Sequence, residues 1–148
     1  MSSAIAKQSV VIAGTPEKLY DFVSEAKRAT TFIPGLSKIE NVNPAQASVG
    51  QTWTYEFDWF GVLVKGNSKC NAAQRPNKYG FQTLTGNSSD WAYSFEPEGK
   101  GKTRLTLEVR YHVPDQMIAK FASQGTLEKM NNDRAREIVN NVKTMIEG

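Results

Sequence analysis

The sequence predicts an α+β fold in which a curved antiparallel sheet of about seven strands wraps around a long C-terminal helix, with two short helices after the first strand. Three observations support this prediction. Apolar residues recur at helical spacing near the C-terminus, they alternate with polar residues across the middle of the chain, and a capped helix start follows an early apolar segment.

The stretch from Pro114 to Gly148 carries one apolar stripe at helical spacing, with mostly polar residues off it. A helix of this kind needs a large apolar surface to lie on. Gly125 is followed by Thr126, whose hydroxyl can cap a new helix, and this pair indicates a bend or break between a short helix and a longer terminal one. The stripe consists of Met117, Ile118, Phe121, Leu127, Met130, Ile138, Val142, Met145 and Ile146.

A strand and short helices are predicted at the N-terminal end. Residues 5–13 end in an apolar run that is typical of a strand. Thr15 can then cap a helix that has Pro16 at its first position, so we expect a short amphipathic helix over about residues 16–25. Residues 27–33 can add another turn or two, which the following proline and glycine would stop.

The middle of the chain alternates apolar and polar residues with the period of a strand. Turn residues such as glycine, proline and asparagine separate the alternating segments at short spacing. Each segment has one polar and one apolar face, so we expect the sheet to be covered on one side. The predicted strands are Leu36–Val42, Thr52–Trp59, Val64–Ala72, Phe81–Thr85, Asp90–Glu96 and Arg104–Val113.

Length and composition are those of one globular domain, which we expect to span residues 1–148. Hydrophobic residues make up 39% of the chain, and no apolar run approaches the roughly 20 residues that a membrane span requires. The formal charge of +3 is mild, and basic residues are scattered among carboxylates. Since nucleic-acid binding would want a concentrated basic face, we expect no nucleic-acid partner.

Cysteine usage and the N-terminal residues bear on the compartment. The one cysteine, Cys70, cannot form an internal disulfide, which agrees with a reducing environment. The first residues lack the basic flank and apolar core of a secretory signal. We therefore expect a cytoplasmic protein.

Several segments resemble the START-like superfamily, also called SRPBCC, and together they cover nearly the whole chain. These segments are residues 11–23, residues 32–35 leading to 39–42, residues 49–50 and residues 141–147. The Ile-Pro-Gly step at residues 33–35, followed by Ile-Glu at 39–40, is similar to the branch that contains one of the carbon monoxide dehydrogenase subunits. The resemblance implies a helix-grip fold whose sheet and terminal helix enclose a cavity for an apolar ligand. Members range from lipid and quinone carriers to polyketide cyclase/dehydrases, so the fold leaves the function open.

The sequence gives its own reason to expect a pocket. Aromatic residues dominate the apolar faces of some strands, and small residues dominate those of others; such faces can also simply interdigitate. Inward tyrosines and tryptophans carry polar tips that need a partner, which favours a pocket holding water or ligand. The expected ligand-binding residues are Trp53, Tyr55, Phe57, Phe81, Trp91, Tyr93, Phe95, Leu107, Val109, Tyr111, Met117, Phe121 and Met130.

Catalytic sets are hard to assemble from this composition. His112 is the one histidine of the chain, and its alternation places it on the polar face, where a solvated side chain is expected. Cys70 falls in an inward series and is expected to be a small packed residue. We expect no catalytic residue, no metal and no cofactor. An acid–base role would fall to Tyr55, Tyr93 or Tyr111, because buried phenols can orient a carbonyl without ionising.

The turn after the second predicted strand is unusually apolar. Trp59, Phe60 and Leu63 surround it, where a hairpin tip normally carries polar residues. Ordinary packing is one interpretation, and a contact patch at the pocket mouth for a membrane or partner protein is the other. The expected pocket rim comprises Phe32, Ile33, Pro34, Trp59 and Phe60.

These observations lead to a first hypothesis and two alternatives. The first is binding or transport of a small hydrophobic molecule (a lipid, quinone or polyketide-like aromatic) in a cavity between sheet and C-terminal helix. The second is an enzyme of the cyclase/dehydrase type that uses pocket tyrosines on a polyketide-like substrate. The third is an accessory module for assembly or membrane attachment of a larger enzyme.

Overall fold

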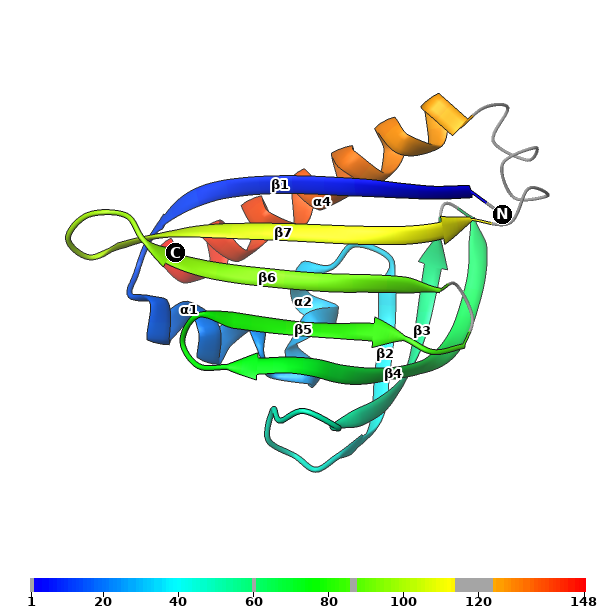
Figure 1. Ribbon diagram of the computed structural model, residues 1–148, viewed down its shortest axis with the longest axis horizontal. Helices are drawn as coiled ribbons and strands as arrows, with labels where there is room; N and C mark the ends of the chain where they lie inside the picture. Colours follow the sequence, from blue (N-terminus) through cyan, green and yellow to red (C-terminus); the bar gives the residue numbers. More distant parts are fainter. Residues whose placement is uncertain (1, 60, 86–87, 114–123) are drawn as a thin grey trace.

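A computed structural model describes residues 2–59, 61–85, 88–113 and 124–148. Within these ranges the chain forms a seven-stranded antiparallel sheet in the order β1-β7-β6-β5-β4-β3-β2, with its helices against one face (Figure 1). The predicted α+β helix-grip architecture is therefore confirmed. The strands are β1 Ser2–Ala13, β2 Leu36–Asn43, β3 Thr52–Trp59, β4 Val62–Gln74, β5 Lys78–Thr83, β6 Ser89–Pro97 and β7 Lys102–Val113; the helices are α1 Pro16–Val23, the 3-10 helix η1 Ala26–Arg28, α2 Ala29–Phe32 and α4 Gln124–Glu147.

The sheet is strongly curved. At one edge β1 pairs with β7, joining the first strand to the last over the full length of both. At the other edge the β2–β3 pairing shifts register twice, and β4–β5 shifts once between Cys70 and Ala72. Such irregularities bend a strand and increase its twist. In Figure 1, β2 and β3 accordingly run at a steep angle to β1 and β7, which makes the sheet concave toward the helices.

The short helices begin and end where the sequence chemistry requires. Thr15 Oγ1 accepts a hydrogen bond from the Lys18 amide at 3.2 Å, and Pro16 occupies the first helical position. Two short helical segments follow α1 and end in extended backbone at Ile33, before the proline. Gly35 then takes φ +88°, and a Cβ there would lie 2.5 Å from the Asp58 carbonyl oxygen, so this turn requires glycine.

The C-terminal helix α4 packs mainly against β1 and also contacts β7. It begins at Gln124, next to Gly125 and Thr126. The predicted shorter helix before it, with Met117 and Phe121, lies outside the described residues, so the predicted bend or break stays a prediction. Met145 is predicted in the buried stripe but is 45% exposed in the last turn. The buried positions of α4 are Leu127, Asn131, Ala135, Ile138, Val139 and Val142.

Hydrogen bonds fix the end of α4 to the rest of the fold. Lys143 Nζ donates to the Val11 carbonyl at 2.9 Å, and the Ala13 amide donates to Glu147 Oε2 at 2.9 Å. Asn141 Nδ2 donates to the Phe32 carbonyl at 3.1 Å, which ties α4 to α2. The helix is thus held along the β1 edge, leaving the other part of the concave face to the short helices. No helix within the described ranges is long and apolar enough to cross a bilayer.

Candidate functional site

A cavity lies between the concave face of the sheet and the segment α1–η1–α2. Its volume is about 60 Å³, which is room for a few water molecules. Every described residue that lines it is uncharged. The lining consists of Val23, Ala26, Ala29, Phe32, Ile33, Leu36, Ile39, Trp53, Tyr55, Phe57, Trp59, Val64, Ser68, Tyr79, Phe81, Thr83, Ser89, Trp91, Tyr93 and Tyr111.

Most of the residues predicted to bind ligand or to form its rim come together in this lining. They reach it from the four strands β3, β5, β6 and β7 and from the end of α2, because residues two apart on a strand share one face and neighbouring strands place those faces side by side. These residues are Trp53, Tyr55, Phe57, Phe81, Trp91, Tyr93, Tyr111, Phe32, Ile33 and Trp59. All three tryptophans of the sequence are among them.

Other predicted residues do not line the cavity. Phe95 packs edge-on against Tyr20 of α1, with ring centroids 5.7 Å apart. Leu107 and Val109 are fully buried on β7, which packs between β1 and β6 and contacts α4. Half-buried Met130 and Pro34 lie outside the lining as well, and the predicted Met117, Phe121 and Phe60 lie outside the described residues.

The position of the cavity also differs from the expectation. The sequence predicts it between the sheet and the C-terminal helix, yet no residue of the described part of α4 lines it. The reason is that α4 lies along β1, at the sheet edge opposite to β2 and β3. The short helices cover the curved half of the sheet instead.

Sequence reasoning missed several lining residues. Tyr79 was not predicted because the predicted strand Phe81–Thr85 begins after it, although Tyr79 is two residues from Phe81 and so shares its face. Val23 and Ala26 belong to the apolar stripe of the first helix, which is equally typical of core. The other residues missed are Ala29, Leu36, Ile39, Val64, Ser68, Thr83 and Ser89.

Aromatic rings form one wall of the cavity. Phe81 and Trp91 on neighbouring strands stack with centroids 5.3 Å apart and planes 15° apart, and Trp53 meets Phe81 edge-on at 5.3 Å. Tyr79 and Tyr93 stack at 6.2 Å. Contacts of this kind stabilise the rings beyond their burial and present flat apolar surfaces to the cavity.

Several polar groups in the wall form hydrogen bonds with the protein itself. Ser89 Oγ accepts a hydrogen bond from Trp91 Nε1 at 3.0 Å and lies 3.0 Å from Thr83 Oγ1. The Tyr55 hydroxyl donates to the Thr85 carbonyl at 2.9 Å. The Tyr93 hydroxyl differs: it is buried and has no hydrogen-bond partner among the residues that the structure describes.

The lining phenols are neutral. Burial raises the pKa of Tyr79 and Tyr93 well above the ordinary value of 10.0, and neighbouring phenols add to the rise. Burial likewise raises the pKa of Tyr111. These side chains therefore offer O–H donors and do not act as bases near neutral pH.

One cation from α4 reaches the edge of this region. The Arg134 guanidinium lies over the Phe57 ring, 5.1 Å from its centroid, and Nη1 is 3.3 Å from the Asp58 carbonyl oxygen. Burial lowers the pKa of Arg134 from its ordinary value. Arg134 thus contacts the lining residue Phe57 near the end of β3 and lies close enough to Tyr111 to affect the pKa of its phenol.

The remaining chemical candidates lie away from the cavity. Cys70 is fully buried, and burial raises the pKa of its thiol, so it is not an activated nucleophile. His112 is half-buried on the opposite face of β7 from Tyr111. Within the described ranges, no cluster of histidine, cysteine or carboxylate side chains is suited to hold a metal ion.

The apolar turn after β3 is only partly at the surface. Trp59 is 1% exposed and packs inward, so it cannot belong to a surface contact patch, whereas Leu63 is 62% exposed. Phe60 is not among the described residues. The packing interpretation therefore holds for Trp59, because this side chain lines the cavity.

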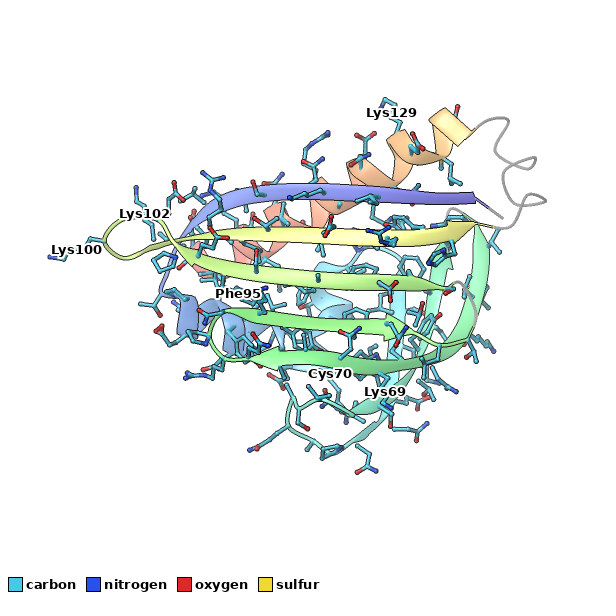
Figure 2. The ribbon with its side chains drawn as sticks, in the orientation of Figure 1. Lys69, Cys70, Phe95, Lys100, Lys102 and Lys129 are labelled. Atoms are coloured by element: carbon cyan, nitrogen blue, oxygen red, sulfur yellow. The ribbon has the colours of Figure 1, made fainter. Side chains whose placement is uncertain are left out.

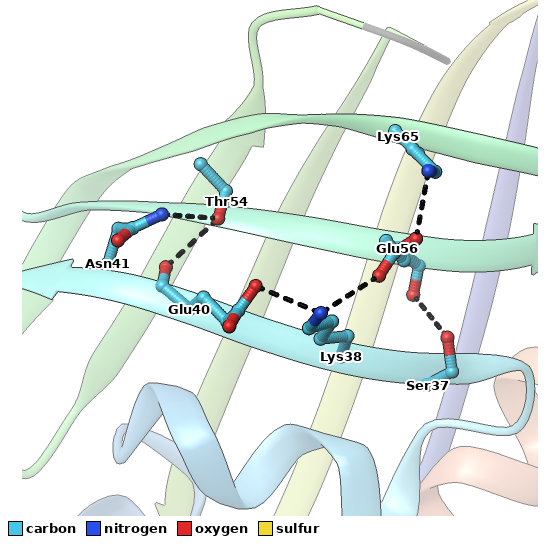
Figure 3. A network of polar contacts seen from close by, with 7 residues as sticks. All are labelled: Ser37, Lys38, Glu40, Asn41, Thr54, Glu56 and Lys65. Atoms are coloured by element: carbon cyan, nitrogen blue, oxygen red, sulfur yellow. Dashed lines mark hydrogen bonds and ion pairs between the residues drawn. The ribbon is translucent and has the colours of Figure 1, made fainter.

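Charged side chains occupy the outer face of β2, β3 and β4. Lys38 bridges Glu40 at 3.3 Å and Glu56 at 3.7 Å, and Lys65 bridges Glu56 at 3.3 Å (Figure 3). Exposed pairs of this kind contribute little stability. They mark the face of the sheet that is turned to solvent.

Basic residues are dispersed over the molecule. Lys100 and Lys102 lie at the turn between β6 and β7, and Lys129 lies near the start of α4 (Figure 2). Lys69 is on β4, next to the inward Cys70. The mixed, scattered pattern predicted from the sequence is present in the fold.

Comparison with known proteins identifies one family whose sequence pattern matches nearly the whole chain. The pattern of the family described as polyketide cyclase/dehydrase and lipid transport matches residues 3–147. A search of curated proteins found no match.

Similar solved structures share the fold at low sequence identity. The KanY protein has a TM-score of 0.77 at 14% identity, with 100% of each chain covered. The ZhuI aromatase/cyclase from Streptomyces sp. R1128 has a TM-score of 0.76 at 13% identity, with 99% of this chain and 94% of that one covered. A START superfamily protein from Mycobacterium smegmatis has a TM-score of 0.74 at 13% identity, with 97% of each chain covered.

Proposed function

Because the chain belongs to the polyketide cyclase/dehydrase and lipid transport family, with its START-like helix-grip fold, we propose that it binds a small hydrophobic molecule in the cavity under α1, η1 and α2. The observation that carries the proposal is the uncharged, largely aromatic lining of that cavity. Residues 1–148 would form one ligand-binding domain. The expected location remains the cytoplasm.

The magnitude of burial is sufficient for binding without a charged anchor. An apolar ligand that buries about 400 Å² gains roughly 10 kcal/mol at ~25 cal/mol per Å², and association removes about half or more of this. The remainder, about 5 kcal/mol or less, corresponds to dissociation constants of roughly 0.2 mM or weaker. Within this range a molecule can be taken up and released again.

Ligand entry requires the cavity to widen. A ring system larger than benzene needs more than the cavity's 60 Å³, since benzene itself fills a cavity of about 150 Å³. Phe57 and Phe81 line the cavity but are only half-buried, so their rings have solvent on one side into which they can turn. The bound state would therefore differ from this one in side-chain rotamers along β3 and β5.

The cyclase/dehydrase alternative has less support. Acid–base catalysis on a carbonyl substrate calls for a group that ionises near neutral pH within reach of the substrate. No carboxylate or imidazole is found in the described lining, and its phenols are neutral. The composition of the cavity thus favours a carrier or sensor.

Fluorescence tests the proposal, because the tryptophans surround the cavity. We expect the neutral apolar dye N-phenyl-1-naphthylamine to quench tryptophan emission by energy transfer, with saturation at one dye per chain. Ala29→Leu adds bulk to the lining and should weaken dye binding at least tenfold. Ala92→Leu, the same change on the exposed face of β6, is the matched control and should leave affinity unchanged.

The outcomes separate clearly. Saturable binding that Ala29→Leu weakens and Ala92→Leu does not would support the proposal. Failure of the folded wild-type protein to bind the dye, together with recovery of no bound molecule by native mass spectrometry, would exclude it.

A further inference from the structure

The Tyr93 hydroxyl is a feature of the cavity wall that the described part of the fold does not explain. Tyr93 lies in the middle of β6, is 2% exposed and lines the cavity, and its oxygen has no hydrogen-bond partner among the described residues. Buried polar atoms almost always have a partner, so each exception in a native structure needs an explanation.

The polar groups of the wall whose hydrogen bonds the structure shows do not bond to the Tyr93 hydroxyl. The Ser89 hydroxyl accepts from Trp91 and contacts Thr83, and the Tyr55 hydroxyl donates to a backbone carbonyl. The strands on either side of Tyr93 place Tyr79 and Leu107 opposite it. Of these, Leu107 has no polar atom, and the Tyr79 ring stacks on Tyr93 at 6.2 Å.

The chemistry of the missing partner follows from the group and its surroundings. A neutral phenol has one O–H to donate. In an apolar site a hydrogen bond is stronger than in water, and leaving the donor without an acceptor costs more free energy. The described lining carries no charge, and Arg134 lies over Phe57 near the end of β3, so we expect the ligand group beside Tyr93 to be uncharged, because a buried charge needs a counter-charge. The stacked rings of Phe81 and Trp91 form a flat surface beside this position.

We propose that the Tyr93 hydroxyl is the polar anchor of the site and donates a hydrogen bond to a carbonyl oxygen of the bound molecule. The ligand class is then an uncharged, planar, conjugated ketone. This inference rests on the proposed function and deepens it, because it specifies one polar atom in an otherwise apolar ligand. It assigns Tyr93 a binding role and no chemical step.

Two probes of nearly equal shape test the inference. 2-Acetylnaphthalene and 2-isopropenylnaphthalene differ by an oxygen in place of a methylene group, and each can be measured by displacement of N-phenyl-1-naphthylamine. One satisfied hydrogen bond predicts that the ketone binds about 5- to 10-fold more tightly than the alkene. In Tyr93→Phe this preference should disappear, through loss of ketone affinity with alkene affinity unchanged or improved.

Tyr55→Phe is the matched control. It removes a hydroxyl from another lining tyrosine, but that hydroxyl is already bonded to the Thr85 carbonyl, so the ketone preference should remain. Stability gives a second readout. Because the Tyr93 hydroxyl has no partner among the described residues of the unliganded protein, Tyr93→Phe should unfold at the same urea concentration as wild type or at a higher one.

Each result decides the question. Dye binding with equal affinity for ketone and alkene would overturn the anchor and leave the proposed function standing. A parallel loss of both probes in Tyr93→Phe would assign Tyr93 a packing role and would also overturn the anchor. Absence of any dye binding would exclude the proposed function, and the anchor with it.

Discussion

Leucine and isoleucine truncations distinguish the packed half of the interior from the hollow half. Leu107 is fully buried on β7 outside the cavity, and Ile33 is 4% exposed and lines it. Leu107→Ala and Ile33→Ala each remove three carbons, a transfer loss of about 2.4 kcal/mol at ~0.8 kcal/mol per methylene. A cavity created by the substitution costs additional free energy, because the atoms around it lose contacts. We expect this additional cost for Leu107→Ala, whereas Ile33 already faces a cavity.

We therefore expect Leu107→Ala to lower the free energy of unfolding by about 4 kcal/mol and Ile33→Ala by about 2 kcal/mol. Urea titrations followed by circular dichroism measure both values, with unchanged slopes required for the comparison. Adding N-phenyl-1-naphthylamine should raise the midpoint of Leu107→Ala more than that of Ile33→Ala, because Ile33 contributes to the ligand site. Equal losses for the two variants would refute the distinction between a packed and a hollow region.

Three further expectations concern backbone and charge. Gly35→Ala places a Cβ at φ +88° and 2.5 Å from the Asp58 carbonyl oxygen, so it should lower the free energy of unfolding by about 1–3 kcal/mol in urea titrations. Gly125→Ala is the control: its Cβ meets open space in α4, so it should leave the free energy of unfolding unchanged or raise it by up to about 1 kcal/mol. Arg75 donates two hydrogen bonds to Asp21 and holds the pKa of that carboxyl below its ordinary 3.8, so the stabilisation is present above pH 3.8 and disappears as the pH falls through the lowered pKa. Arg75→Gln should therefore lower the urea midpoint only slightly at neutral pH, since the pair is exposed, and should not lower it in strong acid; a loss that persists in acid would contradict this assignment. Burial raises the pKa of Tyr93, so ionisation of this phenol does not affect the free energy of unfolding below pH 10.0 and lowers it progressively as the pH rises further. An ultraviolet titration should therefore show the Tyr93 tyrosinate appearing only as the protein unfolds.

The strands could be predicted from the sequence because their alternation is unambiguous. In β6, Trp91, Tyr93 and Phe95 alternate with polar or small residues, and all three are buried as expected. The same parity rule placed Tyr55 and Trp53 inward. A period of two determines the face of a residue whatever the tertiary context, provided that no bulge intervenes.

The position of the cavity could not be predicted in the same way. Parity shows that Phe95 and Leu107 point inward, but it does not show which part of the concave face each helix covers. That depends on the hydrogen bonds of Lys143 and Glu147 with β1, which join residues more than a hundred positions apart. That the Tyr93 hydroxyl has no partner among the residues in the described ranges could not be predicted either, because it depends on how neighbouring side chains pack and bond.

Amide chemical shifts measured during a titration with N-phenyl-1-naphthylamine test the central claim most directly. If the ligand occupies the cavity under the short helices, the largest changes should fall on Ala29, Ser68, Tyr79 and Tyr93, and resonances of Ile138 and Val142 in α4 should change little. Changes concentrated on α4 and β1, with the β5 and β6 residues unaffected, would contradict the account.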